Sequence, residues 1–374
     1  MPENVTEAEW HAELATRRAA IWQIVRQHNC DIALIFGSTG HSEPFRYLTN
    51  FVPVLGDCWG LLTGSQQMAC VLNFNWQLEE ARRLSGVEAW YGLFDPHPRL
   101  TELLKAAAPQ RIGVVGLHRL PVTAFEAIKT ALPGVTFEDI TSAVAFLRRQ
   151  KSPLEARLLR EAGRITDAAF DAIRTEIKPG MTEVEVAARL GYHMQGMGAE
   201  LSFAPTVVSG NLDPIPIRMP TQRQLEIGDS VMIDMGAEYQ GYQADASRTF
   251  VLGEPNDKQR EVWETIVRAY DASLAKIRPG VPCNELHKAA VQVFTDAGYD
   301  LVHRVGHGIG LATSFEWPSL DTETSPLIEG MTFCLEPGIY VEGAGNMKYE
   351  DDVLVTKDGY ELLTSSSNAI VVPV

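Results

Sequence analysis

Five acidic or imidazole side chains in the C-terminal part of the chain constrain the fold more than any other feature. Each stands in a local sequence that would hold it in place: Asp234, Asp245, His307, Glu336 and Glu350. A carboxylate that follows a run such as Val231-Met232-Ile233 is expected to be buried with it, and a buried charge is costly unless it is paired or binds a metal. Four carboxylates and one imidazole suit two hard divalent ions that share bridging carboxylates. We therefore expect the fold to bring these five side chains together around metal.

The composition limits the partners and the compartment. The chain has 374 residues and a formal net charge of −16, which argues against nucleic acid, because phosphate binding needs a basic surface. Its apolar runs are all shorter than the ~18 residues of a membrane span, and the first residues lack the features of a secretory signal. Five scattered cysteines without a Cys-x-x-Cys pair are typical of reduced thiols in the core of a cytoplasmic protein.

The organisation changes near residue 150. The first part, residues 1–150, alternates helical and strand-like patterns and predicts an α/β domain with a mixed sheet. The helical patterns lie at 9–27 and 76–84, and the strand-like runs at 31–36, 59–62, 68–72 and 112–115. The polar segment 148–153 ends in Ser152-Pro153, which favours a domain boundary.

The second part, residues 151–374, predicts helices first and then strands. Residues 153–176 and 182–196 have helical patterns, opened by the capping boxes Ser152/Glu155 and Thr182/Glu185. Two further helices are predicted at 257–276 and 283–297, and strands at 205–208, 230–234, 245–251, 331–335 and 353–356. A turn at 240–242 would place Asp234 and Asp245 on neighbouring strands. The whole chain is therefore expected to be an α+β protein.

In the order and setting of its five ligand-type residues, the second part resembles the pita-bread metallohydrolases, which include aminopeptidase P, prolidase, methionine aminopeptidase and the metal-free creatinase. The first part resembles the smaller N-terminal domain of the creatinase/prolidase branch, notably at Arg46-Tyr47-Leu48-Thr49-Asn50-Phe51. The resemblance implies a pita-bread domain preceded by a creatinase-type α/β domain, and a homodimer. It also implies that Asp234, Asp245, His307, Glu336 and Glu350 are metal ligands and that Glu336 acts as general base and acid.

The chain departs from the family pattern at several positions. Peptidases of the family place a histidine at the position of Ile217, and a second one at the position of Ser314 or, with one insertion, Phe315. A third family histidine is kept as His303, and Lys348 stands where an arginine is frequent. These differences leave room for a small substrate other than an Xaa-Pro peptide.

The resulting hypothesis is a hydrolase that uses two divalent ions, with Mn²⁺ or Co²⁺ favoured and Fe or Zn as alternatives, to cleave a C–N bond in an Xaa-Pro peptide. In this hypothesis Glu336 acts as general base and acid, and His303 stabilises the oxyanion. Arg218 is a candidate for binding a substrate carboxylate, with an ion-paired arginine as an equal alternative, and Phe315 and Trp317 are candidates for an apolar substrate wall. Two other functions stay open: the metal site redirected to a small metabolite, as in ectoine hydrolase or dimethylsulfoniopropionate lyase, and an inactive binding protein.

Overall fold

The chain divides into two compact units. The computed structural model describes residues 5–211, 215–312 and 316–374, and the units are Met1–Leu147 and Arg148–Val374. The domain boundary that the sequence places near residue 150 stays a prediction. None of the helices in the described residues is both long enough and apolar enough to cross a membrane.

The first unit is built on one mixed six-stranded sheet with the strand order β4-β3-β2-β1-β5-β6. The strands are β1 (Ile32–Ser38), β2 (Asp57–Leu62), β3 (Met68–Leu72), β4 (Ala89–Gly92), β5 (Arg111–Val115) and β6 (Thr136–Asp139). The α-helices are α1 (Glu7–Gln27), α2 (Glu43–Thr49), α3 (Leu78–Ser85), α4 (His97–Ala107), α5 (Val122–Ala131) and α6 (Thr141–Arg148), with short 3-10 turns at Asn75–Gln77 and Leu117–Arg119. The predicted α/β domain with a mixed sheet is therefore confirmed.

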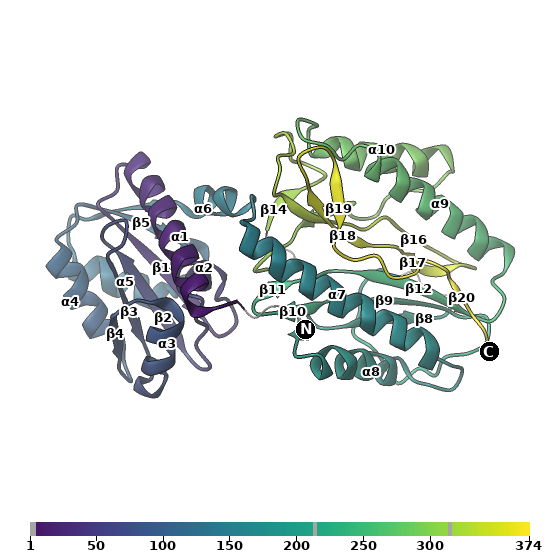
Figure 1. Cartoon of the computed structure of the whole chain (residues 1–374), viewed down its shortest axis with the longest axis horizontal. Helices are drawn as coiled ribbons and strands as arrows, with labels where there is room; N and C mark the ends of the chain where they lie inside the picture. Colours follow the sequence, from purple (N-terminus) through teal and green to yellow (C-terminus); the bar gives the residue numbers. More distant parts are fainter. Residues whose placement is uncertain (1–4, 212–214, 313–315) are drawn as a thin grey trace. The chain divides into compact units, whose positions relative to one another are not determined.

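The second unit carries two pairs of long helices. They are α7 (Pro153–Glu176) with α8 (Glu183–Gly196), and α9 (Asp257–Leu274) with α10 (Asn284–Asp296). Figure 1 shows the strands of this unit between the two helix pairs. The capping boxes predicted at Ser152 and Thr182 are both formed, because each side chain accepts a hydrogen bond from the N3 backbone while the N3 glutamate reaches back.

Two larger sheets form the middle of this unit, one of strand order β20-β12-β9-β8 and one of order β14-β13-β15-β18-β19. A three-stranded sheet β11-β10-β7 and a hairpin β16-β17 complete it. In chain order, the earlier strands of the unit are β7 (Glu200–Leu201), β8 (Thr206–Ser209), β9 (Ser230–Asp234), β10 (Ala237–Tyr239), β11 (Tyr242–Gln243), β12 (Ser247–Leu252) and β13 (His307–Gly308). The others are β14 (Glu316–Ser319), β15 (Thr332–Leu335), β16 (Gly338–Val341), β17 (Gly345–Lys348), β18 (Asp351–Val355), β19 (Tyr360–Leu362) and β20 (Val371–Val372).

The helix pairs cover different sheets. Apolar residues of α7 and α8 pack with residues of β9 and β12, such as Ile233 and Phe250, in one buried core. Apolar residues of α9 and α10 pack with residues of β15 and β18, such as Phe333 and Val353, in a second core. The two sheets meet where the amide of Glu350 donates to the carbonyl oxygen of Ser247, at 3.2 Å. This junction brings the ends of β9, β12, β15 and β17 to one place.

Glycines allow that close approach. A Cβ added to Gly306 would lie 2.0 Å from the carbonyl oxygen of Cys334, and one added to Gly236 would lie 1.8 Å from that of Ala244. Both clashes are with backbone, which cannot move aside as a flexible side chain could. Gly306 and Gly236 therefore let the segments carrying His307 and Asp234 lie against their neighbours.

We predict that Gly306→Ala lowers the free energy of unfolding by about 1–3 kcal/mol, the usual cost of forcing extra volume into a packed site. The measurement is urea unfolding of the whole chain. Gly196→Ala is the matched control, because a Cβ there meets nothing within 4 Å and Gly196 ends a helix. Equal stabilities of the two variants would contradict the close-approach argument.

Candidate metal centre

The five side chains singled out in the sequence come from the ends of neighbouring strands. Asp234 is the last residue of β9, and Asp245 lies two residues before β12, which pairs with β9 in antiparallel register. His307 begins β13, Glu336 directly follows β15, and Glu350 lies between β17 and β18. All five are buried, and Glu350 is fully enclosed. The predicted neighbourhood of Asp234 and Asp245 is confirmed, although Asp245 stands just outside the strand.

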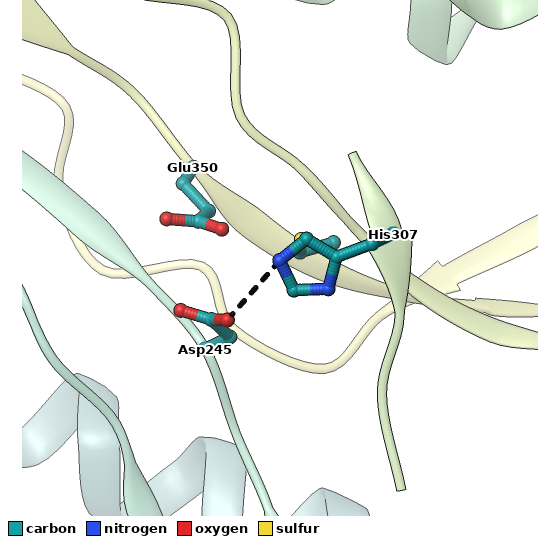
Figure 2. Close-up of side chains that lie close together, drawn as sticks. Asp245, His307 and Glu350 are labelled. Carbon is teal, nitrogen blue, oxygen red and sulfur yellow. Dashed lines mark ion pairs between the residues drawn. The ribbon is translucent and has the colours of Figure 1, made fainter. Parts of the chain in front are cut away.

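The side chains of Asp245, His307 and Glu350 converge. Figure 2 shows both carboxylates turned toward the imidazole, and Nε2 of His307 lies 3.6 Å from Oδ2 of Asp245. The same Nε2 lies 3.6 Å from Oε1 of Glu336. Ligand atoms of Asp245, His307, Glu350 and Cys334 all lie within 4.8 Å of one another. The sequence predicted Cys334 to be an ordinary core thiol, and only the tertiary fold places it in this cluster.

Lys348 supplies a positive charge inside the same cluster. Its Nζ donates to Oδ2 of Asp234 at 2.8 Å and to Oε2 of Glu336 at 2.9 Å. The ammonium also forms an ion pair with Oε2 of Glu350 at 3.0 Å. The side chain is 5% exposed, so these contacts are shielded from solvent. Lys348 therefore neutralises part of a group of carboxylates that would otherwise repel one another.

The remaining carboxylate oxygens suit a metal ion. Within the described residues, Oδ1 of Asp234 and Oε1 of Glu350 are buried and accept no hydrogen bond. A buried carboxylate oxygen without a donor is unfavourable, and coordination of a hard divalent cation satisfies it. Asp245, His307 and Glu350 add oxygen and imidazole ligands of the type that such cations use. The residues present thus fit the metal that the sequence predicted.

Burial and the neighbouring charges move the pKa values of these groups in opposite directions. Burial, only partly offset by Lys348, raises the pKa of Glu350 to about 8. Burial and the carboxylates of Glu350 and Asp234 raise the pKa of Asp245 well above its usual range. For Glu336 the effect of burial is outweighed by Lys348 and His307, and its pKa falls to about 2. Glu336 is therefore an ionised carboxylate at neutral pH, as a general base must be.

His303 lies beside the cluster in a defined tautomer. Its Nδ1 is 2.7 Å from the carbonyl oxygen of Arg304, which only accepts, so Nδ1 carries the hydrogen. Burial lowers the pKa of His303, so the ring is neutral and its Nε2 accepts the hydrogen bond, of 2.8 Å, from the hydroxyl of Tyr340. In this arrangement His303 orients Tyr340. Donation from Nε2 to an oxyanion, as the sequence hypothesis required, would need another tautomer or a protonated ring.

A cavity of about 320 Å³ opens onto the cluster. Its polar wall includes Asp234, Asp245, His307, Glu336 and Lys348, together with His303, Arg304 and Tyr340. The rest of the wall is formed mainly by Phe203, Ala204 and Ile217. Ile217 thus presents an apolar side chain to the cavity at the position where the family's peptidases have a histidine. Arg304 is a cavity cation that the sequence analysis did not name.

The predicted substrate-binding residues lie elsewhere or outside the described residues. Both terminal nitrogens of Arg218 donate to the carboxylate of buried Glu183, each at 2.6 Å, and Arg218 does not line the cavity described above. This geometry favours the ion-paired alternative for Arg218. Trp317, in β14, also does not line that cavity, and Phe315 is not among the described residues. Substrate roles for these three residues stay predictions.

Comparisons with known proteins identify the class of protein. Residues 157–357 match the model of metallopeptidase family M24, and residues 17–150 match that of the creatinase/prolidase N-terminal domain. The chain belongs to metallopeptidase family M24: it is a creatinase-type N-terminal domain followed by a pita-bread domain of mixed α+β structure, as the sequence predicted. The family implies divalent metal ions.

Individual relatives resemble the chain over most of its length. A Xaa-Pro dipeptidase of Pyrococcus horikoshii is 31% identical over 87% of this chain and 91% of its own. Among solved structures, a Xaa-Pro dipeptidase from Bacillus anthracis has a TM-score of 0.85 at 29% identity, covering 97% of this chain and all of that one. An X-Pro aminopeptidase from Thermotoga maritima has a TM-score of 0.86 at 28% identity, covering 96% and 99%.

The raised pKa values predict a pH-dependent metal affinity. Below about pH 8 Glu350 holds a proton that a metal must displace, so the affinity for Mn²⁺ is expected to tighten as the pH rises from 6 toward 8. Isothermal titration of chelator-treated protein at several pH values measures this. Glu350→Gln removes the titrating group, and it should bind the ion more weakly and with a flatter pH profile. An affinity independent of pH in the unaltered protein would contradict the prediction.

Proposed function

We propose that this chain is a metal-dependent peptidase that hydrolyses the bond before proline in short Xaa-Pro peptides. The observation that carries the proposal is the meeting of four carboxylates and an imidazole, most of which line one cavity, in an M24 pita-bread domain. Relatives named Xaa-Pro dipeptidase, alike over nearly the whole chain, support the same substrate class. In this proposal Asp234, Asp245, His307, Glu336 and Glu350 are the metal ligands.

The cavity offers complementary surfaces to a dipeptide. Phe203, Ala204 and Ile217 provide an apolar wall against which a pyrrolidine ring can pack. Arg304, in the same wall, provides a guanidinium for a free carboxylate. Because Arg218 is held by Glu183, Arg304 takes over the role that the sequence hypothesis gave to Arg218. A substrate with its carboxyl terminus one residue after the cleaved bond fits these features.

Glu336 is the residue that moves the proton. It is ionised at neutral pH and lines the cavity, so it accepts a proton from the attacking water and passes it to the leaving nitrogen. A bound divalent ion supplies activation of water and polarisation of the carbonyl. The hydroxyl of Tyr340, which also lines the cavity, donates a hydrogen bond to His303.

A second candidate function rests on Ile217. An isoleucine in the cavity wall removes a hydrogen-bond donor that the family's peptidases have there, and the wall becomes more apolar. A small metabolite that needs fewer donors suits this wall, such as the substrate of an ectoine hydrolase or of a dimethylsulfoniopropionate lyase. The metal ligands and Glu336 would be unchanged in that case.

The proposal includes the ion, the assembly and the compartment. We keep Mn²⁺ or Co²⁺ as the favoured ions, because the site is rich in carboxylates, with Fe or Zn as alternatives. The resemblance to the creatinase/prolidase branch supports a homodimer. All five cysteines are free and buried, which supports a reducing, cytoplasmic compartment.

Turnover of a small panel tests the function. With Mn²⁺ added, we expect cleavage of Ala-Pro and Gly-Pro, and a loss of about 10²–10⁴-fold in kcat for Glu336→Gln, because the base is removed. Glu342→Gln, at an exposed position outside the cavity lining, is the control and should retain activity. Turnover of ectoine or dimethylsulfoniopropionate in place of the dipeptides would favour the second function, and none with any substrate would favour an inactive binding protein.

The role of Arg304 has a separate test. Arg304→Met should raise KM for Ala-Pro by about ten- to a hundredfold, because a charge-assisted hydrogen bond to the carboxylate is lost. Ala-Pro amide, which lacks that carboxylate, should show nearly the same KM with both proteins. An equal rise in KM for the acid and the amide would show that Arg304 does not bind the carboxylate.

A further inference from the structure

Glu183 is a buried carboxylate that the proposed mechanism does not use. It is the first residue of α8, its side chain is fully enclosed, and it does not line the catalytic cavity. Its carboxylate accepts six hydrogen bonds of 2.6–2.9 Å, from the amide and hydroxyl of Ser209, the amide and hydroxyl of Thr221, and both terminal nitrogens of Arg218. One side chain thus joins three segments of the chain.

The donors keep this carboxylate charged. Burial by itself would raise the pKa of Glu183, but the hydrogen bonds from Arg218, Ser209 and Thr221 outweigh burial and lower the pKa to about 2. Glu183 is therefore ionised at neutral pH. Its two bonds with Arg218 are charge-assisted and bidentate, which is the stronger and more directional kind of hydrogen bond.

Through these bonds Glu183 connects a metal-bearing strand pair to one wall of the cavity. Ser209 is the last residue of β8, which pairs with β9 along its length up to Asp234. On the other side, Arg218 directly follows Ile217, which lines the cavity. The place of Ile217 is therefore fixed relative to the sheet that carries the first proposed metal ligand.

The segment 215–220 depends on Arg218 for its position. In the part of the chain that the structure describes, the hydrogen bonds that join 215–220 to other segments all come from the guanidinium of Arg218. Backbone hydrogen bonds to α8 begin only at Thr221, whose carbonyl oxygen accepts from the amide of Val184 at 3.2 Å. The ion pair is thus the polar contact that holds the segment in place.

Apolar packing holds this segment only weakly. The side chains of Ile215, Ile217 and Met219 are 43%, 72% and 62% exposed. Exposed apolar surface is costly in water, and an apolar ligand that covers it gains the corresponding free energy. Ile217 can therefore contribute to substrate binding, provided that the segment does not move away from the cavity.

We propose that Glu183 and Arg218 are positioning residues, whose ion pair holds residues 215–219 so that Ile217 forms a fixed apolar wall against the substrate. Neither residue touches the substrate or moves a proton. The inference rests on the proposed function for the assignment of the cavity as the substrate site. Loss of the ion pair lowers the affinity for substrate, because only molecules with the wall in place bind it well. The metal ligands and Glu336 keep their places, so kcat is retained.

Arg218→Met gives the first test, because it removes the guanidinium and keeps a long side chain. The KM for Ala-Pro should rise by about tenfold, with kcat changed by less than about twofold. Ala-Pro amide, which lacks the carboxylate, should show the same rise. A rise confined to the acid would show that Arg218 binds the substrate carboxylate directly. That result, or an unchanged KM for both substrates, would overturn the proposal.

Arg160→Met is the matched control. Arg160 also donates two hydrogen bonds to one glutamate, Glu361, each of 2.7 Å, and does not line the cavity. The KM for Ala-Pro should be the same in this variant as in the unaltered protein. A rise as large as that of Arg218→Met would mean that loss of any such ion pair has this effect, and would overturn the proposal.

Glu183→Gln removes the other partner of the ion pair. It should raise KM by a similar factor, and the double variant Glu183→Gln/Arg218→Met should be no worse than either single variant, because all three break the same contact. Effects on KM that multiply would show that the two residues act separately, against the proposal. If Glu183→Gln does not fold by circular dichroism, Arg218→Met and its control decide.

A spin label tests the position of the segment without turnover. Met219→Cys carries a nitroxide at an exposed position, while all five native cysteines are buried. The resonance spectrum should show slow motion of the label, and faster motion after Arg218→Met. Equal motion in both proteins would refute the inference, even if Xaa-Pro peptides are cleaved. Faster motion without cleavage of any Xaa-Pro peptide would refute the proposed function and leave the role of the ion pair standing.

Discussion

The structure depends on one constraint: four carboxylates buried together cannot all stay charged unless cations lie among them. Lys348 supplies one positive charge at 2.8–3.0 Å from three of these carboxylates. The raised pKa values of Asp245 and Glu350 show that this single charge does not suffice for all four. The cluster therefore needs further positive charge, which a divalent ion supplies. The fold tolerates the unsatisfied oxygens because metal binding and the assembly of the site are linked.

A second group of buried polar side chains holds the backbone of the cluster. Arg248 is almost fully buried, and its guanidinium donates to the carbonyl oxygen of Glu350 and to the carboxylate of Asp351, each at 2.6 Å. The carboxylate of Asp352 accepts from the backbone amide of Asp245 at 2.9 Å. The backbone of two proposed ligands is thus held by the buried side chains of Arg248 and Asp352, which do not line the cavity described above. Support of this kind keeps ligand positions fixed within the small tolerance that a metal site allows.

The sequence predicted those parts of the structure that depend on local pattern. Helix α7 has the predicted bounds, since Ser152, Pro153 and Glu155 specify its start through neighbouring residues. Asp234, His307 and Glu336 were recognisable because each follows or interrupts an apolar or glycine-rich segment, and the other two ligand-type residues by their order along the chain. The partner of Arg218, the thiol of Cys334 in the cluster and the position of Lys348 among three carboxylates were not predicted. Each depends on contacts between residues far apart in the chain, such as Arg218 with Glu183, for which no local pattern exists.

The hydrogen bonds of His303 change which groups can stabilise negative charge in the cavity. A neutral imidazole that donates from Nδ1 to a carbonyl oxygen and accepts at Nε2 from Tyr340 has no hydrogen left for a substrate. Tyr340 likewise directs its hydroxyl hydrogen at His303. Ile217 also offers no hydrogen-bond donor. The two cationic side chains of the described cavity wall are those of Lys348 and Arg304. An oxyanion is then stabilised by fixed positive charges more than by a histidine. The rate of the reaction should therefore depend less on the ionisation of a histidine than it would if histidines filled these places in the cavity wall.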